Sequence, residues 1–172
     1  IYIVTKRKLK TKYVVYKSIY SLKNKGIDAI FITSPANEHY KILNLFYRDN
    51  IHFFIEKPIF EKTKNIKLIS EHFSKLNSPI LQVGYVFRHD ELFLKFKSLI
   101  NSKILGTILK ADIYCGSDLN SWRPNTNLKN SISLNKNQGG GVLLELSHEI
   151  DYCLWLFGDI KVIFSKLNRS GI

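Results

Sequence analysis

Five short apolar segments dominate the first half of the chain, and the last three alternate with stretches of helical length. The segments lie at 1–5, 13–16, 28–33, 51–56 and 79–85, and the helical stretches lie at 37–48 and 62–76. The segments are rich in Ile, Val, Phe and Tyr, which favour strands. Near-continuous apolar strands separated by helices are typical of a parallel sheet that is covered on both faces. The first half therefore predicts an α/β fold with a doubly wound parallel sheet.

After Arg88 the pattern changes. An amphipathic stretch, an apolar strand, a polar segment, a helix and a further strand follow in that order, at 91–100, 104–115, 116–138, 141–158 and 160–167. One helix with two strands is typical of the start of an α+β domain built on an antiparallel sheet. We therefore expect two partial domains, at 1–88 and 89–172. The chain contains no Met and begins within a predicted strand, so we expect a fragment.

The charge balance is strongly positive, with 26 Lys and Arg against 14 Asp and Glu and a formal net charge of +12. Most of the positive residues are Lys, spread over every predicted helix, whereas proteins that recognise nucleic acids cluster their charge and rely on Arg. None of the nucleic-acid-binding signatures occurs in the sequence. This favours a solvated surface over a nucleic-acid partner, and only the basic run at 6–12 leaves an anionic ligand open.

Several other classes of protein are disfavoured. No apolar run approaches the roughly 18 residues of a membrane span. At the N-terminus the basic residues follow the apolar ones, which is the reverse of a secretory signal. We therefore expect a cytoplasmic protein without a membrane partner. Cys115 and Cys153 have no neighbours at metal-ligand spacing, so neither a disulfide framework nor a metal site is predicted.

The first candidate site is the turn that follows the strand at 28–33. It contains five residues that suit a ligand-binding strand-to-helix turn, namely Thr33, Ser34, Pro35, Asn37 and His39. Ligands of open α/β sheets bind at the carboxyl ends of strands, where loop amides and a helix N-terminus point outward. Asn37 is a good N-cap. A simple capped turn, with His39 as a partly buried surface residue, explains the same residue types.

The second candidate is Glu56-Lys57-Pro58, which directly follows the strand at 51–56. These residues lie at the same carboxyl edge of the predicted sheet as the first turn. A Lys held there by a carboxylate can protonate or stabilise an oxygen that gains negative charge. A strand-end ion pair at the surface is the alternative, and such pairs are weak indicators of function.

The third candidate lies on the predicted helix at 141–158. Glu145, His148 and Tyr152 are spaced by three and four residues, so they share one helical face. A carboxylate one turn from a His can orient it and tune it for proton transfer near neutral pH. The alternative is a His packed against the sheet with Asp151 in solvent. A zinc site would need a third or fourth ligand, which the sequence does not offer.

Together these motifs resemble the family of glucose-fructose oxidoreductase, inositol dehydrogenase and MocA, abbreviated Gfo/Idh/MocA. The resemblance covers nearly the whole chain and rests on five motifs in the family's order: 28–35 with His39, 56–58, 84–85 with Arg88, 122–124, and 139–151 with 155–158. The sequence of residues 144–151 looks most like that of family members from surface-polysaccharide sugar pathways.

The resemblance implies a Rossmann domain that binds NAD or NADP, followed by a domain that presents a sugar or nucleotide-sugar substrate. It implies that Lys57 donates a proton or stabilises an oxyanion, that His148 takes the hydroxyl proton, and that Glu145 assists. Further residues would contact the substrate, namely Tyr85, Arg88 and Tyr152. Others would line the cofactor, namely Thr33, Ser34, Pro35, Asn37, His39, Glu56, Trp122 and Arg123. A homo-oligomer is implied for the full-length enzyme.

The sequence departs from the family pattern in two places. Many members carry Asp four residues before the His, whereas position 144 is Leu and the acid is Glu145. No GxGxxG turn occurs, although this turn holds the pyrophosphate at the first strand of a Rossmann fold. The segment at 1–5 then corresponds to the second strand, and we expect the chain to lack the first strand with its loop and most of the C-terminal domain.

The same correspondence bears on the choice of cofactor. Where NAD-preferring enzymes place an acidic residue, this chain has Thr5-Lys6-Arg7. Arg7 is therefore predicted to favour the 2′-phosphate of NADP, with ordinary surface charge as the alternative. Two other functions stay open: a non-catalytic remnant or binding module of the same fold, and, more remotely, a basic nucleic-acid-binding protein.

Overall fold

The computed structural model describes residues 1–64, 66–118, 121 and 131–168. Its central element is a three-stranded parallel sheet in the order β3 (Ala29–Ile32), β4 (His52–Ile55) and β5 (Leu81–Val83). The register places Ile30 opposite Phe53 and Phe53 opposite Leu81. The parallel sheet predicted from the alternating segments is thus confirmed. Its three strands end at one edge, so the turns that follow them are neighbours.

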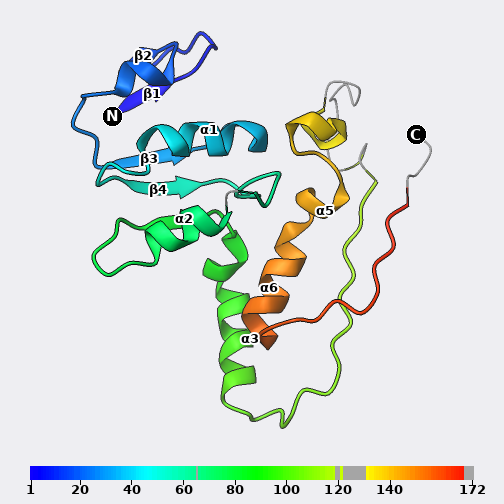
Figure 1. Ribbon diagram of the computed structural model, residues 1–172. Coiled ribbons are helices and arrows are strands. Elements are labelled where there is room, and N and C mark those ends of the chain that lie inside the picture. Colours follow the sequence, from blue (N-terminus) through cyan, green and yellow to red (C-terminus); the bar gives the residue numbers. More distant parts are fainter. Residues whose placement is uncertain (65, 119–120, 122–130, 169–172) are drawn as a thin grey trace.

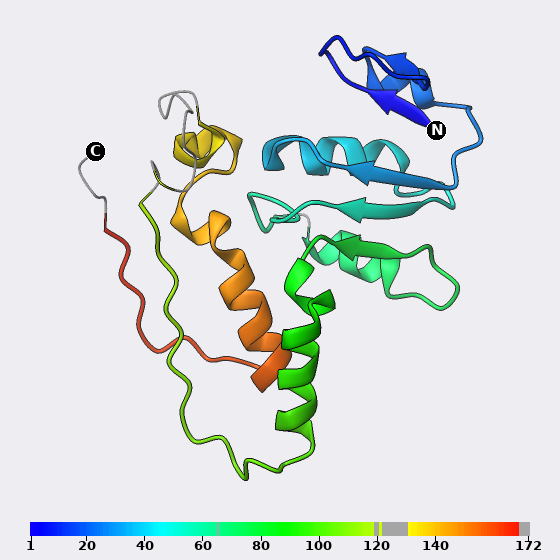
Figure 2. The ribbon, with the colours of Figure 1, turned by 180° about the vertical axis from the view of Figure 1, so that it is seen from behind.

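Two helices connect these strands and lie on the same face of the sheet (Figure 1). They are α1 (Ala36–Phe46) and α2 (Ile66–Phe73). Right-handed crossovers that progress in one direction across a sheet place their helices on one side. Among the described residues, the opposite face of this sheet is uncovered (Figure 2), and Phe31 on it is 72% exposed.

The core lies between the sheet and these two helices. Along α1 the residues at spacing four and three, His39, Leu43 and Phe46, are buried, which is the pattern of a helix with one apolar face. Leu43 is completely buried, and Ile69 of α2 is almost so. They pack on the inward side chains of the sheet, namely Ile30, Ile32, Phe53 and Ile55. The core therefore fixes the strand ends to the start of α1.

The first strands form a second, smaller sheet. β1 (Tyr2–Val4) and β2 (Val14–Tyr16) pair in parallel, and the 3-10 helix η1 (Ile19–Leu22) follows them. In the Rossmann strand order 3-2-1-4-5-6, this pair corresponds to strands 2 and 3, and the larger sheet corresponds to strands 4, 5 and 6. No strand within the described residues joins β1 to β3.

The second half begins with the 3-10 helix η2 (Val86–His89) and α3 (Glu91–Asn101). The Asp90 side chain caps α3 by accepting hydrogen bonds from the backbone N–H groups of Leu92 and Phe93. After the short helices η4 (Ile132–Leu134) and η5 (Lys136–Gln138), the chain forms α5 (Val142–Glu145) and α6 (Ser147–Phe157). Both views show α3 and α6 side by side (Figures 1 and 2).

The helix expected at 141–158 is interrupted. Leu146 adopts φ −96° and ψ 29°, which is outside the helical range, and it separates α5 from α6. Gly158, with φ 88°, ends α6 near the expected position. The interruption changes the direction of the chain between Glu145 and His148, so these residues belong to two helices.

The strands predicted at 104–115 and 160–167 are wrong for this structure, in which both segments are irregular and exposed. Leu109 and Ile163 are each 92% exposed. A strand is stable only when its backbone groups pair with a neighbouring strand. Neither segment has such a pairing within the described residues. Within the same residues, no helix is long and apolar enough to cross a membrane.

Gly139 brings the second half against the start of α1. Its backbone has φ +85°, and a Cβ added to it would lie 2.7 Å from the Cβ of Ala36. Real Cβ atoms do not approach so closely, so only Gly fits both the backbone conformation and the space. The close approach places α5 beside the strand ends.

We predict that Gly139→Ala lowers the free energy of unfolding more than Gly106→Ala does. Gly106 has a similar φ of +70° but open space around it, so its substitution costs only the backbone strain of about 1–3 kcal/mol. Gly139→Ala adds a steric clash of about 1–3 kcal/mol. Adding Ala36→Gly to Gly139→Ala should recover that second part in urea denaturation. Equal costs for the two glycines, with no recovery, would contradict the close approach.

Candidate active site

The turn after β3 is tied to the loop after β4 by a buried histidine. His39 is 1% exposed, and its Nε2 lies 2.7 Å from the carbonyl oxygen of Ser34. Its Nδ1 lies 3.0 Å from the carbonyl oxygen of Pro58 and 3.2 Å from that of Ile59. Both ring nitrogens are thus engaged with backbone. His39 was expected to line the cofactor; the structure places it beneath the site, where it holds the two loops together.

The start of α1 differs from the prediction that Asn37 caps it. The helix begins at Ala36, with Pro35 at the N-cap position and no side-chain cap hydrogen bond. Pro35 has φ −58°, which already suits the start of a helix, and α1 begins two residues earlier than a cap at Asn37 would place it. Asn37 therefore lies within the first turn. Its Oδ1 and the Oγ of Ser34 are buried without a hydrogen-bond partner among the described residues.

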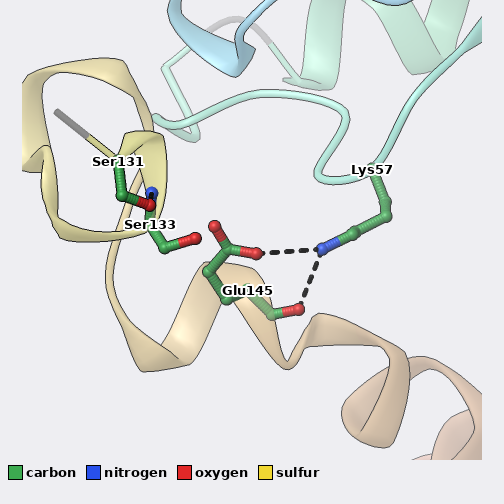
Figure 3. Close-up of polar contacts among 4 residues, drawn as sticks. All are labelled: Lys57, Ser131, Ser133 and Glu145. Atoms are coloured by element: carbon green, nitrogen blue, oxygen red, sulfur yellow. Dashed lines mark hydrogen bonds and ion pairs between the residues drawn. The ribbon is translucent and has the colours of Figure 1, made fainter. Parts of the chain in front are cut away.

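Lys57 joins the end of β4 to α5. Its Nζ donates a hydrogen bond of 2.9 Å to the backbone carbonyl oxygen of Glu145 and lies 3.5 Å from Oε2 of the same residue (Figure 3). The two side chains are 19% and 15% exposed, so the pair is mostly shielded from water. The residues are 88 positions apart in sequence. The structure thus brings together the second and third candidate motifs.

His148 lies on α6 within a ring of aromatic side chains. Its ring centroid is 5.6 Å from that of Tyr85 and 5.2 Å from that of Phe87, both in edge-to-face geometry. Its Nδ1 is buried without a hydrogen-bond partner among the described residues. Burial lowers the pKa of His148 below its usual value, and the positive charge of Lys57 lowers it further. The imidazole is therefore neutral at pH 7 and can accept a proton.

The guanidinium of Arg88 forms an ion pair with the carboxylate of Asp151. Its Nε and Nη2 each donate a hydrogen bond of 2.8 Å to one carboxylate oxygen of Asp151, which is a bidentate pair. The guanidinium also lies 5.9 Å from the ring centroid of Trp155. Lys97 of α3 donates to the backbone carbonyl oxygen of Trp155. Arg88 was expected to contact substrate; in this structure it anchors α6 to the end of β5.

Tyr152, also expected at the substrate, packs in the same aromatic cluster. Its ring lies 5.1 Å from that of Phe93 and 6.0 Å from that of Phe87. Burial raises the pKa of Tyr152 above its usual value. The neutral phenol and the neighbouring rings form one wall beside His148. The aromatic residues Phe87 and Phe93 were not singled out from the sequence, because an amphipathic helix and its flank explain them equally well.

The other predicted residues are placed as follows. Thr33 is exposed at the end of β3, and Glu56 is half-buried next to Lys57. Arg7 lies in the loop between β1 and β2. Trp122 and Arg123 lie outside the described residues. The described part of the chain holds no cluster of three or more His, Cys, Asp or Glu that could bind a metal ion.

Sequence reasoning missed two buried serines beside Glu145. Ser131 and Ser133 are 5% and 6% exposed. Ser131 directly precedes η4 and Ser133 lies within it, and both are near Glu145 (Figure 3). They belong to a Ser- and Asn-rich segment whose composition is that of an ordinary loop. Nothing in the sequence distinguishes these hydroxyls from the neighbouring polar residues.

Two family models match the chain in succession. The model of the oxidoreductase family with an NAD-binding Rossmann fold, GFO_IDH_MocA, matches residues 5–85, and the model of the GFO/IDH/MocA C-terminal domain matches residues 93–171. The chain belongs to the Gfo/Idh/MocA oxidoreductase family. This confirms the family resemblance seen in the sequence motifs, and it confirms the Rossmann-type fold.

Relatives of this Gfo/Idh/MocA chain are substantially longer. Inositol 2-dehydrogenase of Streptomyces avermitilis is 28% identical over 133 residues, which are 77% of this chain and 35% of that protein. The structure of levoglucosan dehydrogenase in complex with NADH and levoglucosan matches with a TM-score of 0.67 at 21% identity, over 85% of this chain and 39% of that one. The myo-inositol dehydrogenase of Lactobacillus casei, in complex with NAD(H) and myo-inositol, matches with a TM-score of 0.60 at 22% identity, over 84% and 39%.

The strand-end turn of this chain fits one part of a nicotinamide dinucleotide. Ser34 and Asn37 each present a buried polar atom without a partner in the described structure. The backbone N–H groups of Ala36 and Asn37 lie in the same turn, at the start of α1, where a helix leaves its first N–H groups without partners of its own. Such groups suit ribose hydroxyls and an amide. The GxGxxG turn for the pyrophosphate is not in the sequence, so the fit concerns the nicotinamide end.

We predict that Lys57→Met raises the pKa of His148. Removing the ammonium group removes a positive charge that disfavours the imidazolium ion, so the pKa moves up toward its usual value. The titration can be followed by NMR on the His148 Cε1–H signal, assigned among the five histidines with His148→Gln. Lys41→Met, which removes an exposed Lys paired with Glu38, is the control. A pKa unchanged by Lys57→Met would mean that the two side chains are not electrostatically coupled.

Proposed function

We propose that this chain forms part of an NAD(P)-dependent oxidoreductase that transfers a hydride between the nicotinamide and a hydroxyl or keto group of a sugar or cyclic polyol. The observation that supports this most strongly is the contact of Lys57 with Glu145, which assembles a cationic donor beside a neutral His148. The dehydrogenases of inositol and levoglucosan among its relatives support the substrate class.

Lys57 supplies positive charge and a hydrogen bond at the reacting oxygen. Its Nζ has three N–H donors, and the Glu145 carbonyl oxygen occupies one of them at a normal hydrogen-bond distance. The contact with Oε2 is longer, so a further N–H can turn toward a substrate oxygen. Because the site is mostly shielded from water, this charge stabilises a developing alkoxide strongly.

His148 acts as the base that accepts the proton of the substrate hydroxyl. Its lowered pKa keeps the imidazole neutral at pH 7, so it can take the proton of a substrate hydroxyl as the carbonyl forms. The edges of Tyr85 and Phe87 hold the ring in one orientation. Asp151, one turn further along α6, is held by Arg88, so it does not compete for that proton.

The hydride chemistry itself is supplied by the dinucleotide when it is bound. Ser34, Asn37 and the first turn of α1 would hold its nicotinamide end, and Glu56 directly follows β4 at the same edge of the sheet. Their role is to align the ring against the substrate carbon that Lys57 and His148 address. Trp122 and Arg123 remain proposed members of this site.

Several finer proposals accompany this function. Within this substrate class we propose a nucleotide sugar from a surface-polysaccharide pathway, because of the sequence of residues 144–151. The domain boundary at 88/89, a homo-oligomeric assembly, a cytoplasmic location and the absence of a nucleic-acid partner stay predictions. Truncation also stays a prediction, next to the fact that the chain spans 35% and 44% of two curated relatives.

We predict that Lys57→Met in the full gene product lowers single-turnover hydride transfer by about 10²–10⁴-fold, as expected for loss of one acid–base group. The dissociation constant for NADH should change little, because Lys57 acts on the reacting oxygen. Mixing the protein with NAD⁺ or NADP⁺ and a panel of inositols and sugars, and following NAD(P)H absorbance by stopped flow, measures the transfer rate, and a fluorescence titration with NADH measures the dissociation constant. Lys41→Met should match the parent protein. An unchanged transfer rate in Lys57→Met would contradict the role of Lys57, and a parent protein without transfer on any substrate would favour a non-catalytic remnant.

We predict that the full gene product prefers NADPH to NADH and that Arg7→Glu reverses the preference. Arg7 lies in the loop that follows β1, where Lys17 Nζ donates to the carbonyl oxygens of Lys6 and Arg7 and orders the loop. A basic side chain at this place suits a 2′-phosphate. The ratio of kcat/KM for the two cofactors is the measurement, and Lys75→Glu is the charge-matched control. A clear NADH preference in the parent protein would overturn the assignment.

A further inference from the structure

The buried hydroxyl of Ser133 has no function in the site as described so far. Ser133 is 6% exposed, and its Oγ has no hydrogen-bond partner among the described residues. Figure 3 shows this hydroxyl directed toward the carboxylate of Glu145. Buried hydroxyls in native proteins are nearly always hydrogen-bonded, so an unpaired one calls for a partner in another state of the site.

Backbone hydrogen bonds fix Ser133 relative to Glu145. The carbonyl oxygen of Ser133 accepts from the N–H of Gly141 at 2.9 Å, and the carbonyl oxygen of Gly141 accepts from the N–H of Glu145 at 3.0 Å. The N–H of Ser133 donates to Oγ of Ser131 at 3.3 Å. One glycine thus links the two residues, and the hydroxyl of Ser133 moves only by rotation of its own side chain.

Glu145 has unused acceptor capacity. Its Oε2 lies 3.5 Å from Lys57 Nζ, which is a long contact, whereas an ionised carboxylate can accept about four hydrogen bonds. The Oγ of Ser133 is shielded from solvent, so a substrate cannot reach it without displacing protein. The acceptor that suits this hydroxyl is therefore the Glu145 carboxylate rather than a ligand group.

We propose that Ser133 is a positioning residue: its hydroxyl donates a hydrogen bond to the Glu145 carboxylate when cofactor and substrate fill the site. The bond holds this carboxylate against the ammonium group of Lys57 and so aims Lys57 at the reacting oxygen. The proposal rests on the function proposed above and adds a residue that acts through Glu145, without contact to substrate.

The test compares Ser133→Ala, Ser133→Thr and Ser133→Cys in the full gene product. Loss of the hydroxyl should lower kcat by about 10- to 100-fold, the cost of a misplaced catalytic group, with KM and the dissociation constant for NADH nearly unchanged. Ser133→Thr keeps the donor and should recover most of kcat. Ser133→Cys keeps the size but donates weakly and should stay low. Ser78→Ala, at a half-buried serine whose hydroxyl donates to the carbonyl oxygen of Phe73, should match the parent protein.

A second readout does not depend on turnover. The ¹³Cδ signal of Glu145 should shift when NADH and an inositol, a pair that does not react, are added together to the parent protein and to Ser133→Thr, and it should not shift in Ser133→Ala. A parent kcat in Ser133→Ala would overturn the proposal, and so would the same Glu145 shift in Ser133→Ala. Equal losses in the Thr and Cys variants would also overturn it, because they would indicate a packing role. If the parent protein shows the Glu145 shift but no turnover, the proposed function fails, and with it the catalytic role of Ser133, while the hydrogen bond from Ser133 to Glu145 stands.

Discussion

The contact between Lys57 and Glu145 is the interaction on which the rest of the site depends. Lys57 follows a strand of the larger sheet, and Glu145 ends a four-residue helix 88 positions later. The carbonyl oxygen of Glu145 accepts the shorter of the two hydrogen bonds. Because a backbone oxygen is placed by the fold itself, the contact is set by how closely α5 approaches the sheet. The tight packing of Gly139 on Ala36 provides that approach.

The electrostatics of the site follow from the same contact. Lys57 lies close enough to lower the pKa of His148, and burial of the imidazole acts in the same direction. A cation that stabilises a developing alkoxide and a neutral base thus lie in one site that is mostly shielded from water. The base takes the proton as hydride leaves and returns it in the reverse reaction. Lys57 binds Glu145, three residues before His148, and Arg88 binds Asp151, three residues after it. These two contacts fix the chain on either side of His148.

Local sequence pattern predicted the elements whose stability is local. The segments at 28–33, 51–56 and 79–85 and the helices between them match β3, β4, β5, α1 and α2 within a few residues, because their apolar residues pack on one another. The segments at 104–115 and 160–167 have the same composition but form no strand, since pairing depends on neighbours that composition does not reveal.

The candidate site was predictable only in part, for a similar reason. Lys57 and His148 stand out because ionisable residues at a strand end and in an apolar helix need an explanation. Three features depend on contacts between distant segments: the ion pair of Arg88 with Asp151, the hydrogen bonds of buried His39 to two loops, and the burial of the Ser133 hydroxyl. The sequence alone leaves such residues indistinguishable from surface charge or loop residues.

The most direct test of the central claim is a crystal structure of the full gene product with NADH and a substrate analogue. We predict that the nicotinamide lies at the carboxyl ends of β3 and β4, with the analogue's oxygen within hydrogen-bond distance of Lys57 Nζ and of the His148 ring. A nicotinamide bound elsewhere, or an analogue whose oxygen contacts neither side chain, would contradict it.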